Sequence, residues 1–155
     1  MKITKAPYLL MLLLLVFAGC SKDDSAADKD PAQSEEYTLR AIGENGVTGS
    51  VTFTEKSDGT ASAFVEISKL ADRTPHPVFI YYNDEAKGGE VAITLNTIDC
   101  DCQSATTEVS KLDNGVRITY QELINFNGHL KVHQGEEEPE LSTIIAQGNI
   151  GSNVN

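Results

Sequence analysis

The sequence predicts an all-β domain, an antiparallel Greek-key β-sandwich, that follows a signal peptide and a flexible tether. Three observations indicate this fold class. Apolar and polar residues alternate in short runs, clusters of Gly, Asn and Asp separate the runs about every ten residues, and no helix of useful length is visible. Seven or eight short strands in such an arrangement are typical of a sandwich or a barrel.

The first element, residues 1–19, resembles a bacterial lipoprotein signal peptide. Lys2 and Lys5 give a positive start, an apolar run follows, and Ala18-Gly19 supply the small residues that a signal peptidase needs beside its cleavage site. The apolar run is shorter than the ~20 residues that cross a bilayer as a helix, which argues against an uncleaved anchor. We therefore expect cleavage before Cys20 and lipidation of Cys20, with chains such as palmitate anchoring the protein stably.

The second element, residues 20–36, comprises the lipidated cysteine and a disordered tether. Its side chains are mostly Asp, Ser, Lys and Ala, so the segment cannot bury enough apolar surface to order itself. Ser21-Lys22-Asp23-Asp24 resembles the Lys-plus-acidic signal by which one group of Gram-negative bacteria exports lipoproteins to the cell surface; the alternative is the plain start of a solvated linker. The expected location is the outer membrane, with exposure at the cell surface if this signal operates.

The third element, residues 37–155, is the single domain, and its ~119 residues are enough for one core. Removing Lys2 and Lys5 with the signal peptide leaves 10 basic residues against 23 acidic ones, a net charge of −13. This charge argues against nucleic acid as a partner and against a basic membrane-binding patch. The expected contact with the membrane is through the N-terminal lipid.

The first predicted strands form a hairpin. Residues Val47 to Thr54 alternate between apolar and polar, as a half-buried strand does, and residues Ala61 to Ser68 do the same. Ser57-Asp58-Gly59 between them provides a turn with a residue that accepts positive φ. A third strand is expected at Val78 to Tyr82 and a fourth at Val91 to Leu95.

The second half of the domain continues the pattern. Further strands are expected at Ala105–Val109, Val116–Tyr120, His129–His133 and Ser142–Gly148, with a turn at Asp113–Gly115 and one helical turn at Gln121–Asn125. No internal repeat is visible.

Two cysteines remain after Cys20 is assigned to lipid: Cys100 and Cys102, in the sequence Asp-Cys-Asp-Cys. In an oxidising envelope the pair would tend to form a local disulfide, although a Cys-x-Cys ring is small and strained. The pair could instead supply soft metal ligands, or stand as free thiols in a turn. The sequence leaves these three alternatives open.

Several short segments, in their order along the chain, resemble the CHRD domain, named after chordin, which is itself similar to the copper/zinc superoxide dismutase sandwich. The segments are Gly46–Thr54, Val65–Leu70, His76–Tyr81, Gly128–His133 and Ile144–Gly151. The resemblance spans roughly residues 39–151 and implies the same sandwich topology.

The resemblance also bears on chemistry. In relatives the third strand carries His-x-His, which places two imidazoles on one face to hold a metal, whereas here those positions are Phe79 and Tyr81. Aromatic rings supply no nitrogen ligands, and copper redox chemistry needs several imidazoles. We therefore expect no superoxide dismutase activity, and no enzyme.

His133 matches the position of a late metal ligand in the resemblance. It could form a weak copper or zinc site with His76 or with Cys100 and Cys102, but not with His129, since four residues of strand separate the two histidines by ~13 Å. The alternative for His133 is a surface imidazole bonded to a backbone carbonyl. His76, between two prolines, is expected to have a structural role.

Two functions are consistent with these observations. The first is a membrane-anchored, surface- or periplasm-facing lipoprotein whose non-catalytic domain binds a protein or glycan, or serves a structural role, with no cofactor. The second is a copper- or zinc-binding protein, related to superoxide dismutase, with a degenerate metal site.

Overall fold

The structure, a computed structural model, describes residues 32–44, 46–68, 74–99 and 103–154. Eight strands pair antiparallel in the order β5-β4-β7-β8-β1-β2-β3-β6. Their bounds are β1 Ser34–Ala41, β2 Thr48–Glu55, β3 Ala61–Ser68, β4 His76–Tyr82, β5 Val91–Ile98, β6 Ser104–Val109, β7 Asn127–His133 and β8 Ile144–Gly151. One turn of α-helix, α1 (Tyr120–Leu123), and one 3-10 turn, η1 (Glu140–Ser142), complete the described elements. The prediction of an antiparallel all-β fold is confirmed.

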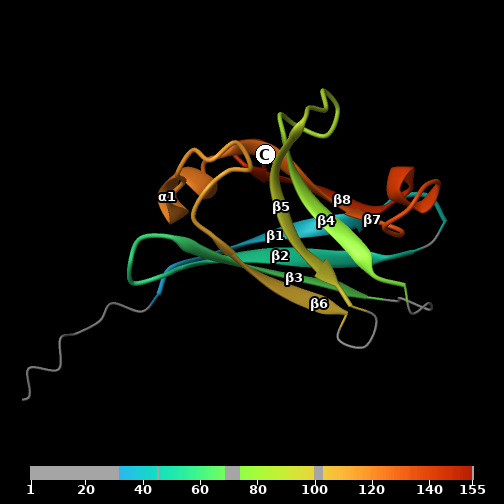
Figure 1. Cartoon of the computed structure of the whole chain (residues 1–155), viewed down its shortest axis with the longest axis horizontal. Helices are drawn as coiled ribbons and strands as arrows, with labels where there is room; N and C mark the ends of the chain where they lie inside the picture. The colour runs from blue at the N-terminus through green and yellow to red at the C-terminus, as the bar shows by residue number, and fades with distance from the viewer. Residues whose placement is uncertain (1–31, 45, 69–73, 100–102, 155) are drawn as a thin grey trace, which may run out of the picture.

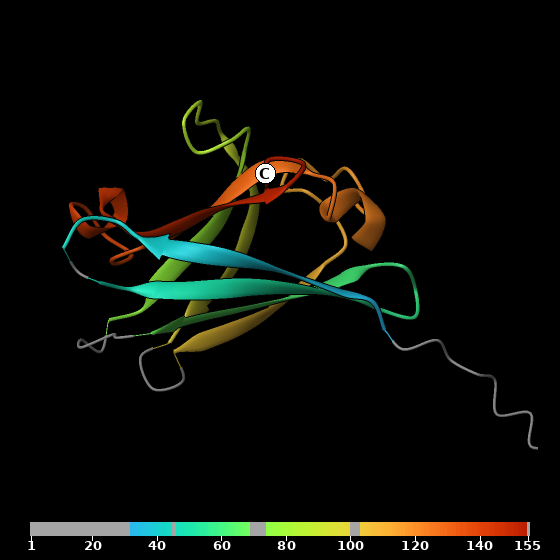
Figure 2. The same cartoon turned by 180° about the vertical axis from the view of Figure 1, so that it is seen from behind.

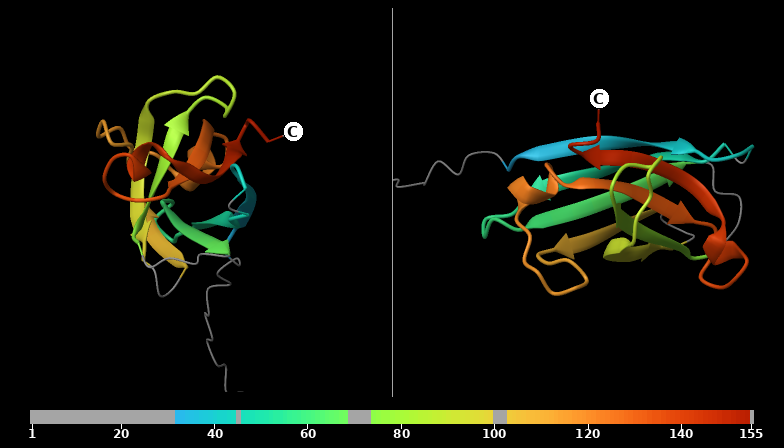
Figure 3. Two further views of the ribbon diagram at one scale, coloured as in Figure 1. Left: turned by 90° about the vertical axis from the view of Figure 1, so that its right-hand side faces the viewer. Right: turned by 90° about the horizontal axis from the view of Figure 1, so that it is seen from above.

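The sheet curls until it is nearly closed into a barrel. β1, β2, β3 and β6 run side by side, and β4, β5, β7 and β8 cross over them (Figures 1 and 2). Seen from its end, in the left view of Figure 3, the sheet curves around an interior. One consequence is that the core has a single inside face, to which every strand contributes alternate residues.

The alternation seen in the sequence places the core. In β3, Ala61, Ala63, Val65 and Ile67 are buried while the residues between them are more exposed. The largest fully buried apolar side chains are Phe53, Leu39, Ile80, Ile98, Leu123, Leu130, Ile150 and Tyr120. The predicted turn between β2 and β3 is also confirmed, since Gly59 has a φ of +79°.

The domain begins earlier than predicted. β1 starts at Ser34, which pairs with Thr54 of β2, so residues 34–36 belong to the sheet and not to the tether. The sequence did contain a signal for this strand, because Tyr37 and Leu39 alternate with polar residues and are both buried.

The predicted strand at Val116–Tyr120 is wrong. Val116 is 58% exposed, and the segment makes only the isolated bridge between Lys111 and Arg117. Thr119 instead begins α1: its side chain accepts the N–H of Glu122, and the Glu122 carboxylate accepts the N–H of Thr119. This reciprocal cap favours a helical turn over extension of the strand.

Side chains close the seam between β5 and β6, the two strands at the ends of the strand order. Asn96 in β5 donates its Nδ2–H to the carbonyl oxygen of Thr106 (2.6 Å), and its backbone N–H to Thr107 Oγ1 (2.7 Å). Further along, the N–H and hydroxyl of Thr94 donate to the carboxylate of Asp113 (3.0 and 2.8 Å). Side-chain acceptors thus satisfy two β5 backbone donors at this seam.

Some sequence predictions lie outside the described residues. They are the signal peptide, the lipidated Cys20, most of the tether, and the pair Cys100 and Cys102. Within the described ranges, no helix has the length and apolar character needed to cross a membrane.

Candidate functional site

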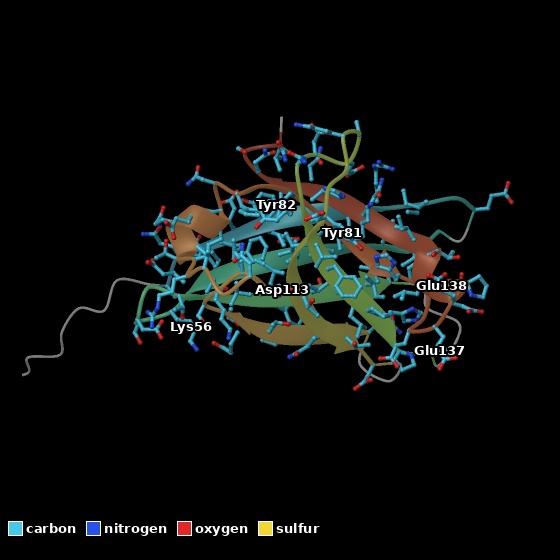
Figure 4. The ribbon with its side chains drawn as sticks, turned by 45° about the horizontal axis from the view of Figure 1, so that its top comes forward. Lys56, Tyr81, Tyr82, Asp113, Glu137 and Glu138 are labelled. Atoms are coloured by element: carbon cyan, nitrogen blue, oxygen red, sulfur yellow. The ribbon has the colours of Figure 1, made fainter. Side chains whose placement is uncertain are left out.

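Five side chains gather on the outer face of β4 and β7, and we call them the outer-face cluster: Phe79, Tyr81, His129, Lys131 and His133. Tyr81 lies opposite His129 and Phe79 opposite Lys131 in the antiparallel register, so the cluster follows from strand pairing. The intervening residues of both strands point into the core. Figure 4 shows Tyr81 lying on the outside of the sheet over β4.

His133 lies at the centre of the polar contacts in the cluster and is only 6% exposed. Its Nδ1–H donates to the carbonyl oxygen of Leu141, which fixes the neutral tautomer with a lone pair on Nε2. The hydroxyl of Tyr81 donates to that Nε2 (3.0 Å). Both ring nitrogens are therefore used by the protein, and the ring ties the segment after β7 to the sheet.

His129 is fully buried and is held differently. Its Nδ1–H donates to the carbonyl oxygen of Asn83 (2.7 Å), in the connection between β4 and β5. Its Nε2 is buried without a hydrogen-bond partner among the described residues. The Tyr81 ring stacks on the imidazole, with centroids 5.3 Å apart and planes 17° from parallel.

The Tyr81 ring connects both histidines. Besides its contacts with them, it carries the ammonium group of Lys131 at 4.6 Å from its centroid, a cation-π contact. Phe79 packs edge-on against Tyr81 (6.2 Å) and His133 (5.3 Å). Burial raises the pKa of Tyr81, so the phenol is a hydrogen-bond donor at neutral pH and not a base.

The two imidazoles are neutral at pH 7. Burial lowers the pKa of both His129 and His133, and the nearby charge of Lys131 lowers it further. The backbone carbonyl that each Nδ1–H contacts acts in the opposite direction and does not offset burial. A neutral, fixed imidazole with its accepting nitrogen bonded to a phenol is a structural connector, because it has no free site for proton transfer.

The donor set does not fit the copper centre that the resemblance implies. Phe79 and Tyr81, which the resemblance would align with the His-x-His ligands, offer no nitrogen, and the lone pair of His133 is taken by Tyr81. Over the residues that the structure describes, no three His, Cys, Asp or Glu side chains lie where they could share a metal ion. The Nε2 of His129, which is buried without a hydrogen-bond partner among the described residues, is a single metal-donor atom.

The structure shows where the three histidines considered in the sequence lie and what each one contacts. His133 does bond to a backbone carbonyl, as one of the two sequence interpretations held, but it is buried and not at the surface. His129 shares its face as expected, while its stacking on Tyr81 was missed; the signal for it is the strand pairing, which single-sequence periodicity does not contain. His76 is buried, and its Nδ1–H donates to the carbonyl oxygen of His133 (3.1 Å), so it has a structural contact.

Comparison with known proteins adds no relationship: no protein-family model matches the sequence, and no curated protein matches it.

Proposed function

We propose that this chain is a lipid-anchored outer-membrane protein whose β domain is a non-catalytic binding or structural module of the CHRD type. The N-terminal sequence supports the anchoring: a short apolar run ends at Gly19-Cys20, followed by a polar acidic segment. The contacts of the module with a protein or glycan partner would then take place outside the membrane.

The strand order supports the Greek-key part of the proposal. β3 and β6 are neighbours, and so are β4 and β7, although two strands intervene along the chain in each case. Each pair brings together the first and the fourth of four successive strands, as a Greek key does. This order is also what the resemblance to the superoxide dismutase sandwich implies.

The observation that carries the non-catalytic assignment is the occupation of the ligand positions by Phe79 and Tyr81. These rings pack against the histidines of β7, and the Tyr81 hydroxyl takes the lone pair of His133. Apart from His129 Nε2, both histidines use their ring nitrogens in hydrogen bonds within the protein, which supports a role in holding loops on the sheet.

The anchoring is tested by metabolic labelling. Cells that produce the full chain are fed an alkyne-tagged fatty acid, and the chain is expected to carry the label, while Cys20→Ser is expected to lose it and remain at precursor size. Protease added to intact cells then reports surface exposure. Absence of label on the unmutated chain would refute a lipoprotein.

The non-catalytic assignment is tested on the purified full chain in detergent, loaded with copper and zinc. We expect superoxide consumption no faster than that of the metals with a denatured sample. The double variant Phe79→His, Tyr81→His places imidazoles at the two positions that carry metal ligands in the resemblance. Its superoxide consumption is measured alongside as the positive comparison. Metal-dependent dismutation by the unmutated chain would overturn the assignment.

One observation favours the second candidate, a copper- or zinc-binding protein that uses His133 with Cys100 and Cys102. Ile98, at the end of β5, pairs with His76, and the ring of His76 contacts the backbone of His133. Ile98 therefore lies at the same end of the barrel as His133, and the two cysteines follow it in the sequence by two and four residues. Metal bound to the reduced chain and lost in Cys100→Ser, Cys102→Ser would support this candidate, and equal binding in both would exclude these thiols.

A further inference from the structure

A polar groove lies outside the outer-face cluster, where the connection between β4 and β5 meets β1, β8 and the C-terminal residues. Its volume is about 500 Å³, and a neighbouring hollow of about 390 Å³ shares four of its residues. The shared residues are Arg40, Glu85, Asn149 and Asn153, and the groove adds Asp84, Ala86, Gln147 and Ser152. The connection stands above the sheet near the C-terminus in Figure 1.

Glu85 is the fixed point of this groove. Its side chain is only 13% exposed, because the guanidinium of Arg40 pairs with it and Gln147 donates its Nε2–H to the same oxygen, Oε2 (2.9 Å). The backbone N–H of Glu85 donates to Asn149 Oδ1 (2.9 Å). Among the described residues no donor reaches Oε1, so this oxygen is left to accept a hydrogen bond from a ligand.

The connection that carries the acidic residues is held rigid by its own hydrogen bonds. Asp84 Oδ1 accepts the N–H of Lys87 (2.8 Å), and Asn83, at a φ of 65°, donates its Nδ2–H to the carbonyl oxygen of Gly88 (2.9 Å). The Nδ1–H of His129 also donates to the carbonyl oxygen of Asn83 and fixes this residue to β7. A site whose polar groups are already positioned loses little conformational entropy when a ligand binds.

The chemistry of the lining favours a neutral polyhydroxylated ligand. Carboxylate, amide and guanidinium groups are planar, and each presents two or more polar atoms side by side, which suits the adjacent hydroxyls of a sugar ring. Two carboxylates against one guanidinium leave the groove with a net negative charge, which disfavours phosphates, sulfates and acidic chains. The guanidinium in turn opposes binding of a free cation.

We propose that this groove, formed by Arg40, Asp84, Glu85, Asn149 and Asn153, is a binding site for neutral glycans. The inference rests on the proposed function, since it names the ligand class and the site of the binding module. The volume lies within the range of ~300–1,000 Å³ that is typical of small-ligand sites. The ligand would be held by hydrogen bonds to Glu85 Oε1, to the amide groups of the two asparagines and to the Asp84 carboxylate.

The experiment measures binding of the full chain, in detergent, to immobilised oligosaccharides: neutral gluco-, manno-, xylo- and chito-oligosaccharides beside acidic polygalacturonate and heparin. We expect binding to at least one neutral series and none to the acidic ones. Glu85→Gln and Asn153→Ala are expected to weaken binding at least tenfold.

Two matched variants serve as controls. Glu108→Gln breaks the ion pair with Lys56, neither of which lines the groove, and Asn125→Ala removes an amide that, like that of Asn153, donates to a backbone carbonyl. Both are expected to stay within twofold of the unmutated chain. Melting temperatures of all four variants, measured alongside, separate loss of the site from loss of the fold.

Each other outcome overturns the inference in a distinct way. Neutral-glycan binding that is unchanged in Glu85→Gln and Asn153→Ala would place the site elsewhere, and a preference for acidic glycans would contradict the charge argument. Absence of any glycan binding by a chain that is lipidated and folded would overturn this site and leave the anchored module standing. Shortened products in the recovered glycan, detected by mass spectrometry, would instead overturn the non-catalytic assignment.

Discussion

Lowering the pH below about 6.5 is expected to destabilise the fold through His129 and His133. Burial holds the pKa of each imidazole below its usual value of 6.5 in the folded chain. Unfolding restores the usual pKa, so once the pH falls through 6.5 the unfolded state binds more protons than the folded state. The free energy of unfolding is therefore unaffected by these groups above that pH and decreases below it, until the pH reaches the lowered folded-state pKa.

The slope follows from proton counting. One proton taken up on unfolding changes the free energy of unfolding by ~1.4 kcal/mol per pH unit, so two buried imidazoles give ~2.7 kcal/mol per pH unit at full effect. The total loss of stability is set by how far burial lowers each pKa, because the slope ends once the pH reaches the folded-state pKa. Lys131 opposes protonation of both rings, and the acidic groups that favour it are Asp84 and Glu85 at His129 and Glu138 at His133.

The assay is urea unfolding of the full chain at pH values from 8 to 5, followed by circular dichroism. His129→Asn and His133→Asn keep an amide N–H near the position of Nδ1 but cannot titrate, so each is expected to remove about half of the slope. A flat profile between pH 6.5 and 5.5 in the unmutated chain, or an unchanged slope in the double variant, would refute the assignment of neutral buried imidazoles.

Three further substitutions test the packing, each by urea unfolding at pH 8. Gly148→Ala places a Cβ 2.2 Å from the carbonyl oxygen of Thr38, which is backbone and cannot yield, so a loss of ~2 kcal/mol or more is expected, and a loss below ~0.5 would contradict the close approach. Thr119→Ala removes the side-chain cap of α1 and should lower the free energy of unfolding by ~1 kcal/mol. No loss would mean that the Thr119 hydroxyl does not accept the N–H of Glu122 in solution. Asn96→Ala should cost ~0.5–1.5 kcal/mol because it removes the solvent-exposed hydrogen bond to the Thr106 carbonyl oxygen, and an unchanged stability would show that water replaces the amide there.

Much of the fold could be predicted from the sequence because strand periodicity is local. The strand at Ala61–Ser68 was predicted to the residue, since its alternation is strict and a turn glycine precedes it. The error at Val116–Tyr120 has the same origin: its alternation is equally good, but a capping box that begins inside it, at Thr119, determines the local structure. Periodicity therefore identifies extended segments but does not show whether such a segment pairs in the sheet or leads into a capped helical turn.

The outer-face cluster could be predicted only in part. That Phe79 and Tyr81 share a face, and His129 and His133 another, follows from each strand alone. Both pairs lie on the same face of the sheet because of the register of β4 against β7. This register pairs residues 48 positions apart (Tyr81 to His129) and is set by the whole barrel. Burial of the imidazoles depends in addition on the segments folded over them, such as that around Leu141.

The side-chain closure between β5 and β6 has a consequence for how the barrel moves. The amide hydrogens of Thr94 and Asn96 are held by the Asp113 carboxylate and the Thr107 hydroxyl, so two rotamer changes release them while every neighbouring ladder stays intact. Amide exchange with deuterated solvent at these two positions should therefore proceed by a local opening, faster than at the paired positions of β2 and β3. This seam is therefore a place where the barrel opens locally without unfolding.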